Sequence, residues 1–299
     1  MSTLSSAAVK ADPGRSGPQE FGRDPDFISR FLPVVDFLLA YFDPEVQGFE
    51  RIPATGPMLI ASNHSGGIYM PDYWSFVRHW IRERGVTEPL YSLSYDLMFS
   101  IPAVSTLARR FGAVPANHDN AGHLLEEGRA VLVYPGGDQD DYRPWTERHH
   151  IDLRGRTGFV RLALRDQVPV VPLVSHGSHD AIFVVSRGDR LAHRIGLDKL
   201  LRVKVLPVVA GIPWGLAVAP IPTVPMPAKV TLRVCEPLDW RHFGPEAADD
   251  PAVVRHCYEE LLGRMQSNLD ELVAAEPHPV LARLRDPARR GSLARHDRA

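Results

Sequence analysis

Short apolar runs alternate with longer helical patterns through the middle of this chain. Four runs, at residues 57–62, 90–94, 130–134 and 168–175, are bounded by glycine, proline or charged residues, which is typical of buried strands. The segments between these runs have the length and spacing of helices. The alternation predicts an α/β fold, with a mixed, mostly parallel sheet flanked by helices.

Particular residues indicate where the helices begin and end. Pro71 suits the first turn of one helix, and Pro102 interrupts another. Asn117 or Asp119 can cap a third helix, which Gly128 ends. The expected helices cover residues 71–83, 96–110 and 156–165, together with the capped segment that runs to residue 127.

Two later segments complete the expected core. Residues 228–235 alternate between apolar and polar side chains, which predicts a strand late in the chain. Residues 251–275 carry apolar side chains at helical spacing, which predicts an amphipathic helix packed against the core. We expect a single domain over residues 21–276, with its core at about residues 50–240.

The composition is that of an ordinary globular protein, with 44% hydrophobic and 23% charged residues. The formal net charge of -2 gives no bias toward nucleic acid, so no nucleic-acid partner is expected. Cys235 and Cys257 form no CxxC pair and are expected to be apolar filler in a reducing compartment. These features predict a cytoplasmic protein and leave the oligomeric state open.

Neither of the two long apolar stretches is predicted to span a membrane. Residues 28–42 are too few and include charged side chains, and residues 205–227 contain six prolines. Both stretches could instead hold the protein at a bilayer surface or belong to the ordinary core.

The two ends of the chain differ in character from its middle. Residues 1–20 lack the apolar segment of a signal peptide and are expected to be a disordered leader. Residues 277–299 form a basic tail, which is either simply solvated or placed against anionic lipid headgroups. We therefore predict peripheral association with a membrane surface.

The first candidate site follows the strand expected at residues 57–62 and reads ASNHSGGIYMPD. Ligands bind at the carboxyl ends of strands in open α/β sheets. His64 is a candidate general base, and Asp72 is the carboxylate that would orient it. Gly66 and Gly67 would present backbone N–H groups to a thioester oxygen. The alternative is a structural histidine beside a turn.

A second glycine-rich turn follows the strand expected at residues 130–134. Gly136 and Gly137 can present backbone N–H groups to an oxygen-rich ligand. Arg143 and Arg148 could bind a phosphate or a carboxylate. One alternative is a plain turn with surface arginines. Another, for Arg143, is an arginine that ties the loop to Asp138, Asp140 or Asp141.

Taken in order, these segments resemble the four sequence blocks of the glycerolipid acyltransferase superfamily, which includes lysophosphatidate and diacylglycerol acyltransferases. The matching segments are NHSGG with the following Asp72, FGAVPAN at 111–117, YPGGDQ at 134–139 and VPVVPL at 168–173. The resemblance covers about residues 50–240. It implies that His64 is the catalytic base and that Asp72 is its partner.

Three positions depart from the family pattern. Seven residues separate His64 from Asp72, where the family usually has four. Gly136 occupies the usual glutamate position of the third block. Asn117 lies where the second block usually has an arginine for the acceptor's phosphate, which implies that Asn117 contacts the substrate. The Pro-Gly-Gly form resembles the diacylglycerol acyltransferase and plant phytyl-ester branches, which implies a neutral alcohol as acceptor.

The resulting hypothesis is an enzyme that transfers a fatty acyl group from acyl-CoA or acyl carrier protein to a hydroxyl of a glycerolipid or related lipid alcohol. The thioester is a co-substrate, and no cofactor or metal is expected. His176 and His179 lack a metal-ligand pattern and are expected in a loop beside the site. The alternatives are a lipid hydrolase using Ser65 or Ser178, without a GxSxG motif, and an inactive lipid-binding protein on the same fold.

Overall fold

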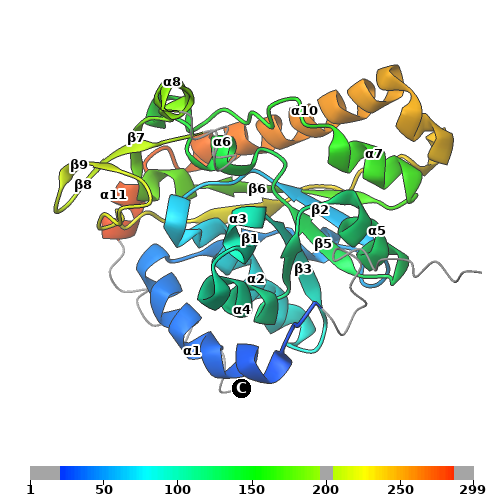
Figure 1. The fold of residues 1–299 in the computed structure, drawn as a ribbon, viewed down its shortest axis with the longest axis horizontal. Helices are drawn as coiled ribbons and strands as arrows, with labels where there is room; N and C mark the ends of the chain where they lie inside the picture. The colour runs from blue at the N-terminus through cyan, green and yellow to red at the C-terminus, as the bar shows by residue number, and fades with distance from the viewer. Residues whose placement is uncertain (1–20, 196–204, 286–299) are drawn as a thin grey trace, which may run out of the picture.

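Seven strands form the central sheet of the computed structural model within the part of the chain that it describes, residues 21–195 and 205–285 (Figure 1). These strands are β1 (Glu45–Gln47), β2 (Met58–Ser62), β3 (Leu90–Ser94), β4 (Ala113–Pro115), β5 (Ala130–Val133), β6 (Val170–His176) and β10 (Thr231–Val234). Their order across the sheet is β1-β10-β6-β2-β5-β3-β4. Only the pairing of β10 with β6 is antiparallel among these strands, so the predicted mixed, mostly parallel sheet is confirmed.

Helices pack on both faces of this sheet (Figure 1). One face carries α1 (Pro25–Phe42), α2 (Pro71–Arg84) and α4 (Pro102–Arg110), and the other carries α5 (His118–Glu126), α7 (Gly158–Arg165) and α10 (Pro251–Ala275). Alternate side chains of β2 enter the two cores: Leu59 and Ala61 pack with α7 and α10, whereas Met58 and Ile60 pack with α2. Coverage on both faces explains why the central strands are apolar throughout.

Most of the predicted elements appear close to their expected bounds. Asn117 is the N-cap of α5, and its side chain accepts a backbone N–H of the first turn at 2.7 Å. Pro102 divides the helix expected at 96–110 into α3 (Asp96–Phe99) and α4. The helix expected at 251–275 is α10 over its full length.

The Pro-rich stretch at 205–227, for which the sequence predicts no element, contributes to a second sheet. This antiparallel sheet contains β7 (Phe183–Ser186), β8 (Val208–Gly211) and β9 (Gly215–Val218). Its buried side chains, including Val184 and Val209, pack against Tyr69 and Tyr142. The small sheet therefore lies beside the loop that follows β2.

The loop that follows β9 is hydrogen-bonded to two distant parts of the chain. The hydroxyl of Tyr41, near the end of α1, donates to the Pro225 carbonyl oxygen at 2.7 Å. The hydroxyl of Tyr69, in the loop after β2, donates to the Thr223 carbonyl oxygen. One short segment thus contacts both a surface helix and the candidate site.

Within residues 21–195 and 205–285, no helix combines the length and the apolar character that crossing a bilayer requires. The apolar stretch at 28–42 lies in α1, and part of the predicted basic tail forms α11 (Pro279–Arg285). The predicted leader and residues 286–299 of the predicted tail lie outside the described residues.

Candidate active site

His64 and Asp72 are in contact where β2 ends and α2 begins. His64 Nδ1 lies 2.8 Å from Asp72 Oδ2, and the fully buried Asp72 also accepts the Ser65 N–H at 3.1 Å. A carboxylate beside Nδ1 keeps a proton on that nitrogen and leaves Nε2 as the basic atom. The structure thus brings the predicted pair together, while its catalytic role stays a prediction.

The seven residues between the pair are folded into a tight turn. Gly66, Gly67 and Met70 have φ angles of 102°, 58° and 43°, in the left-handed region that favours glycine. A Cβ on Gly66 would lie 2.3 Å from Pro71 Cδ, so a side chain has no room there. This compact turn returns the first turn of α2 to the histidine, and the unusually long spacing therefore does not separate the pair.

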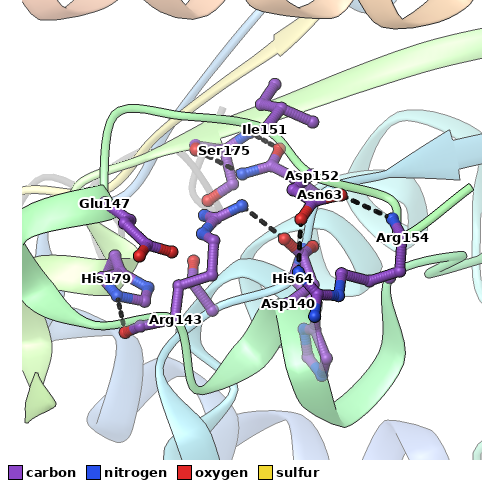
Figure 2. A network of polar contacts seen from close by, with 12 residues as sticks. Asn63, His64, Asp140, Arg143, Glu147, Ile151, Asp152, Arg154, Ser175 and His179 are labelled. Carbon is purple, nitrogen blue, oxygen red and sulfur yellow. Dashed lines mark hydrogen bonds and ion pairs between the residues drawn. The ribbon is translucent and has the colours of Figure 1, made fainter. Parts of the chain in front are cut away.

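Two further carboxylates close the loop from the side of β5. The His64 N–H donates to Asp140 Oδ2 at 2.6 Å (Figure 2). The Gly67 N–H donates to Asp141 Oδ1 at 2.8 Å. Both carboxylates are buried and belong to α6 (Gly137–Asp141), which follows the Pro-Gly-Gly turn. The two candidate motifs of the sequence therefore form a single site.

The charges of this site favour a protonated histidine. Burial lowers the pKa of His64, but the negative charges of Asp72, Asp141 and Asp140 outweigh burial and raise this pKa to about 9. Burial raises the pKa of Asp141 to about 6, against the opposing effect of His64. Burial also raises the pKa of Asp140, although the nearby Arg143 opposes it. With three carboxylates facing it, the imidazole is a poor neighbour for an additional anion.

The aromatic ring of Tyr134, at the end of β5, covers the imidazole. Its centroid lies 4.2 Å from that of the His64 ring, and the two planes are inclined by 33°. Burial raises the pKa of Tyr134 well above its ordinary value, so the hydroxyl stays neutral. Among the described residues this buried hydroxyl has no hydrogen-bond partner.

The glycines of the loop after β2 differ in the availability of their N–H groups. The Gly67 N–H is bonded to Asp141, so the predicted contact of this group with a thioester oxygen is corrected. The Gly66 N–H makes none of the backbone or side-chain hydrogen bonds found in the described part of the chain. If either glycine N–H faces a substrate, it is therefore that of Gly66.

The Pro-Gly-Gly turn is packed too tightly for larger residues. A Cβ on Gly136 would lie 2.2 Å from Asp140 Cβ, and one on Gly137 would lie 2.7 Å from Arg156 Nη1. Arg156 Nη1 donates to the carbonyl oxygens of Pro135 and Gly136 at 3.1 Å each. The small residues let α6 approach the histidine loop, and their predicted contact with substrate stays a prediction.

Three side chains predicted to bind substrate have other partners. Arg143 is only 1% exposed and forms an ion pair with Asp140, as in the alternative interpretation of a loop-tying arginine. The Arg148 guanidinium stacks on Trp145, with its carbon 3.5 Å from the ring centroid. Asn117 caps α5. The sequence pattern cannot tell a surface arginine from a buried one, because both occur in polar loops.

The loop after β6 reaches the same polar network. The His179 Nε2–H donates to the Arg143 carbonyl oxygen at 2.7 Å, which places this loop beside the site as expected (Figure 2). The His176 Nε2–H donates to the Glu276 carbonyl oxygen at 2.7 Å. In the described part of the chain, no group of three or more His, Cys, Asp or Glu side chains is arranged to hold a metal ion. That the protein needs no metal stays a prediction.

The two serines of the hydrolase alternative lack a histidine partner among the described residues. Ser178 Oγ lies 2.8 Å from Ser175 Oγ. Ser65 donates its backbone N–H to the Asp72 carboxylate. A nucleophilic serine needs a base within hydrogen-bond distance. The geometry therefore favours His64 as a base toward an external hydroxyl.

Three residues of this site were not predicted from the sequence: Tyr134, Asp140 and Asp141. The sequence signal that could have identified Asp140 and Asp141 is that they are consecutive aspartates close to the glycine-rich segment at 136–137. Nothing in the sequence distinguishes Tyr134 from an ordinary strand residue.

Comparisons with known proteins point to one family. A family model for acyltransferases matches residues 43–176. An uncharacterized protein of Mycobacterium tuberculosis is 29% identical over 258 residues, which are 85% of this chain and 69% of the relative. The DGAT1/2-independent enzyme synthesizing storage lipids of Bos taurus is 27% identical over 62% of this chain and 54% of its own length. The crystal structure of the 1-acyl-sn-glycerophosphate acyltransferase PlsC from Thermotoga maritima has a similar fold, with a TM-score of 0.50 and 19% identity over 84% of each chain.

Proposed function

Because this chain belongs to the glycerolipid acyltransferase superfamily and is an acyltransferase, we propose that it transfers a fatty acyl group from an acyl thioester to a hydroxyl of a neutral glycerolipid or related lipid alcohol. The thioester is that of coenzyme A or acyl carrier protein. The observation that carries the proposal is the 2.8 Å contact of His64 Nδ1 with the buried Asp72, at the edge of the sheet where substrates bind.

The reaction requires a single base and no covalent acyl-enzyme. His64 Nε2 removes the proton of the acceptor hydroxyl as the hydroxyl oxygen attacks the thioester carbonyl carbon. The carbonyl π electrons move to its oxygen and then return, which breaks the carbon–sulfur bond. The departing thiolate takes the proton from the imidazolium, and the histidine is neutral again. General base catalysis of this kind contributes roughly 10²–10⁴-fold to the rate.

The charges around His64 support an acceptor that is uncharged near its reacting hydroxyl. Asp72, Asp140 and Asp141 are all buried, and Arg143 neutralises only one of them. A phosphate next to the reacting hydroxyl would be repelled by these carboxylates. A diacylglycerol or a fatty alcohol carries no such charge.

Two exposed apolar surfaces support peripheral attachment to the cytoplasmic face of a membrane. On α1, Phe37 is 79% exposed, and in the turn between β8 and β9, Trp214 is 59% exposed. The bond from Tyr41 to Pro225 joins the two surfaces. The exposed apolar side chains are Val34, Phe37, Leu38 and Tyr41 on α1, and Ile212, Trp214, Leu216, Ile221, Val224 and Met226 around the hairpin. Exposed surfaces of this size are characteristic of contact with lipid or protein.

The proposal is tested with the purified protein, a labelled acyl-CoA or acyl carrier protein, and a panel of lysolipids, acylglycerols and fatty alcohols. We expect acyl ester with a neutral acceptor, and none with the His64→Ala variant. His242→Ala, at an exposed histidine outside the site, is the matched control and should keep wild-type activity. Free fatty acid formed at the same rate with or without acceptor would indicate a hydrolase. Lipid binding without ester formation for any donor and acceptor would indicate an inactive lipid-binding protein.

A further inference from the structure

The candidate active site contains one more buried negative charge than its cations balance. Asp72 contacts His64, and Asp140 pairs with Arg143. In the described part of the chain, no lysine, arginine or histidine lies within 4 Å of Asp141. Asp141 is nevertheless buried, with 7% of its surface exposed. A buried carboxylate without its own cation is costly, so its retention calls for a role.

Asp141 forms a hydrogen bond with the loop after β2 that contains His64 and Gly67, called the catalytic loop below. Its Oδ1 accepts the Gly67 N–H at 2.8 Å across two segments that are 74 positions apart in the sequence. A Cβ on Gly67 would lie 2.9 Å from Ile182 Cδ1 and 3.1 Å from the Tyr142 ring, so the turn is also enclosed by neighbouring side chains. Asp141 is thus a link between the turn that shapes the catalytic loop and the helix that follows β5.

The other groups facing His64 do not duplicate this role. Asp72 approaches from α2, Asp140 lies on α6 with Arg143 as its counter-ion, and the neutral Tyr134 covers the ring. Asp141 is therefore the carboxylate with neither a direct ion pair to His64 nor an arginine partner, and the His64 charge is the largest that opposes its own.

We propose that Asp141 is a positioning residue for acyl transfer, which holds the Gly67 turn in place and stabilises the positively charged form of His64. This inference rests on the proposed function, because it assigns Asp141 a part in the step that His64 performs. In the free enzyme the imidazole holds a proton at neutral pH and becomes a base only when that proton leaves. Asp141 raises the pH at which this happens, in addition to the larger effect of Asp72.

The raised pKa values of the two residues agree with this arrangement. Burial lowers the pKa of His64, but Asp72, then Asp141 and to a smaller extent Asp140 raise it to about 9. Asp141, with a pKa of about 6, is raised by burial and lowered by His64. Between these two values Asp141 is ionised and His64 is protonated, so each stabilises the charge of the other.

The test uses substitutions that separate the charge of Asp141 from its hydrogen bond. Asp141→Asn keeps an oxygen that accepts the Gly67 N–H but removes the charge. Asp141→Ala removes both. Asp138→Asn makes the same change of charge on α6 at a partly exposed side chain and is the matched control. The measurements are an NMR titration of isotope-labelled histidine, with the His64 signal assigned from His64→Gln, and the pH dependence of kcat and kcat/KM in the full-length enzyme.

For Asp141→Asn we expect the His64 midpoint and the acid limb of kcat/KM, both of which report the free enzyme, to fall together by about one to two pH units. This is the size expected for removal of one charge a few ångströms away in a protein interior. Asp141→Ala should also lower kcat on the high-pH plateau, because the turn loses its hydrogen bond, with a smaller change in KM. Asp138→Asn should leave both midpoints unchanged.

A His64 midpoint in Asp141→Asn that matches wild type would overturn the inference, and so would an equal shift in Asp138→Asn. Because the NMR titration needs no substrate, it separates this inference from the proposed function. If wild type transfers no acyl group but Asp141→Asn lowers the His64 midpoint, the proposed function fails and the charge coupling stands. If wild type is active and the midpoint does not move, only the inference fails.

Discussion

Replacing Arg143 by alanine tests whether this arginine serves the fold or the substrate. Its guanidinium is buried and forms an ion pair with Asp140, which in turn accepts the His64 N–H. Arg143→Ala leaves the Asp140 carboxylate buried without a counter-ion. The expected effect is a loss of stability, together with some displacement of the catalytic loop.

The magnitude follows from the burial of both partners. Removing one partner of a buried ion pair costs about 3–5 kcal/mol, because the other charge is left without compensation. For a chain of this size, roughly 2 °C of melting temperature corresponds to 1 kcal/mol. Arg143→Ala should therefore lower the melting temperature by about 6–10 °C. Asp140→Asn in the same chain removes the uncompensated charge, and the double variant should regain at least about half of that loss.

The assay combines thermal unfolding with steady-state kinetics of the same preparations. Below the melting transition, kcat of Arg143→Ala should fall, since Asp140 positions the histidine loop, whereas KM for both substrates should change by less than about threefold. The opposite pattern would refute this reasoning. A melting temperature within about 2 °C of wild type, with KM raised tenfold or more, would show that the guanidinium meets an anionic group of the substrate.

Three further predictions follow from the site and its surroundings. His64→Ala should abolish ester formation without changing the melting curve by more than a few degrees, and wild-type turnover in this variant would exclude the mechanism. The kcat/KM of wild type should rise with pH up to about 9, because His64 acts as a base only when neutral; a pH-independent kcat/KM between 6 and 9 would contradict this. Phe37→Ser combined with Trp214→Ser should reduce sedimentation with phospholipid vesicles severalfold and leave circular dichroism unchanged, and undiminished binding would place the membrane contact elsewhere.

The sheet and its helices were predictable from the sequence because their signals are local. Apolar runs bounded by turn residues gave β2, β3 and β5, and the cap residue Asn117 and the break at Pro102 fixed helix ends. Cys235 and Cys257 are free and buried, as expected of apolar filler.

The second sheet could not be predicted in the same way. Its strands are only four residues long, and the prolines of residues 205–227 mask their pattern. A strand of that length is stabilised by its partners more than by its own sequence.

The site residues that belong to an ordered set of motifs could be predicted from the sequence. The residues whose roles depend on contacts in the folded chain could not. His64 and Asp72 were identified from their place after an expected strand and from the order of the motifs, and the structure places them together. The roles of Asp140 and Asp141 depend on contacts with His64 and Gly67, which lie more than 70 positions away. The role of Arg143 depends on its burial beside Asp140, three positions away. Burial of that kind is a property of the folded chain and leaves no periodic pattern in the sequence.

If the protein binds a membrane surface as proposed, the loop after β9 has a thermodynamic consequence. It is hydrogen-bonded on one side to Tyr41 of the exposed helix α1 and on the other to Tyr69 of the catalytic loop. Coupling between two binding events is reciprocal, so if bilayer contact at α1 tightens lipid binding by some factor, bound lipid must tighten bilayer contact by the same factor. An enzyme coupled in this way would dissociate from the membrane most slowly while lipid is bound. Successive turnovers on one membrane would then be favoured over exchange between membranes.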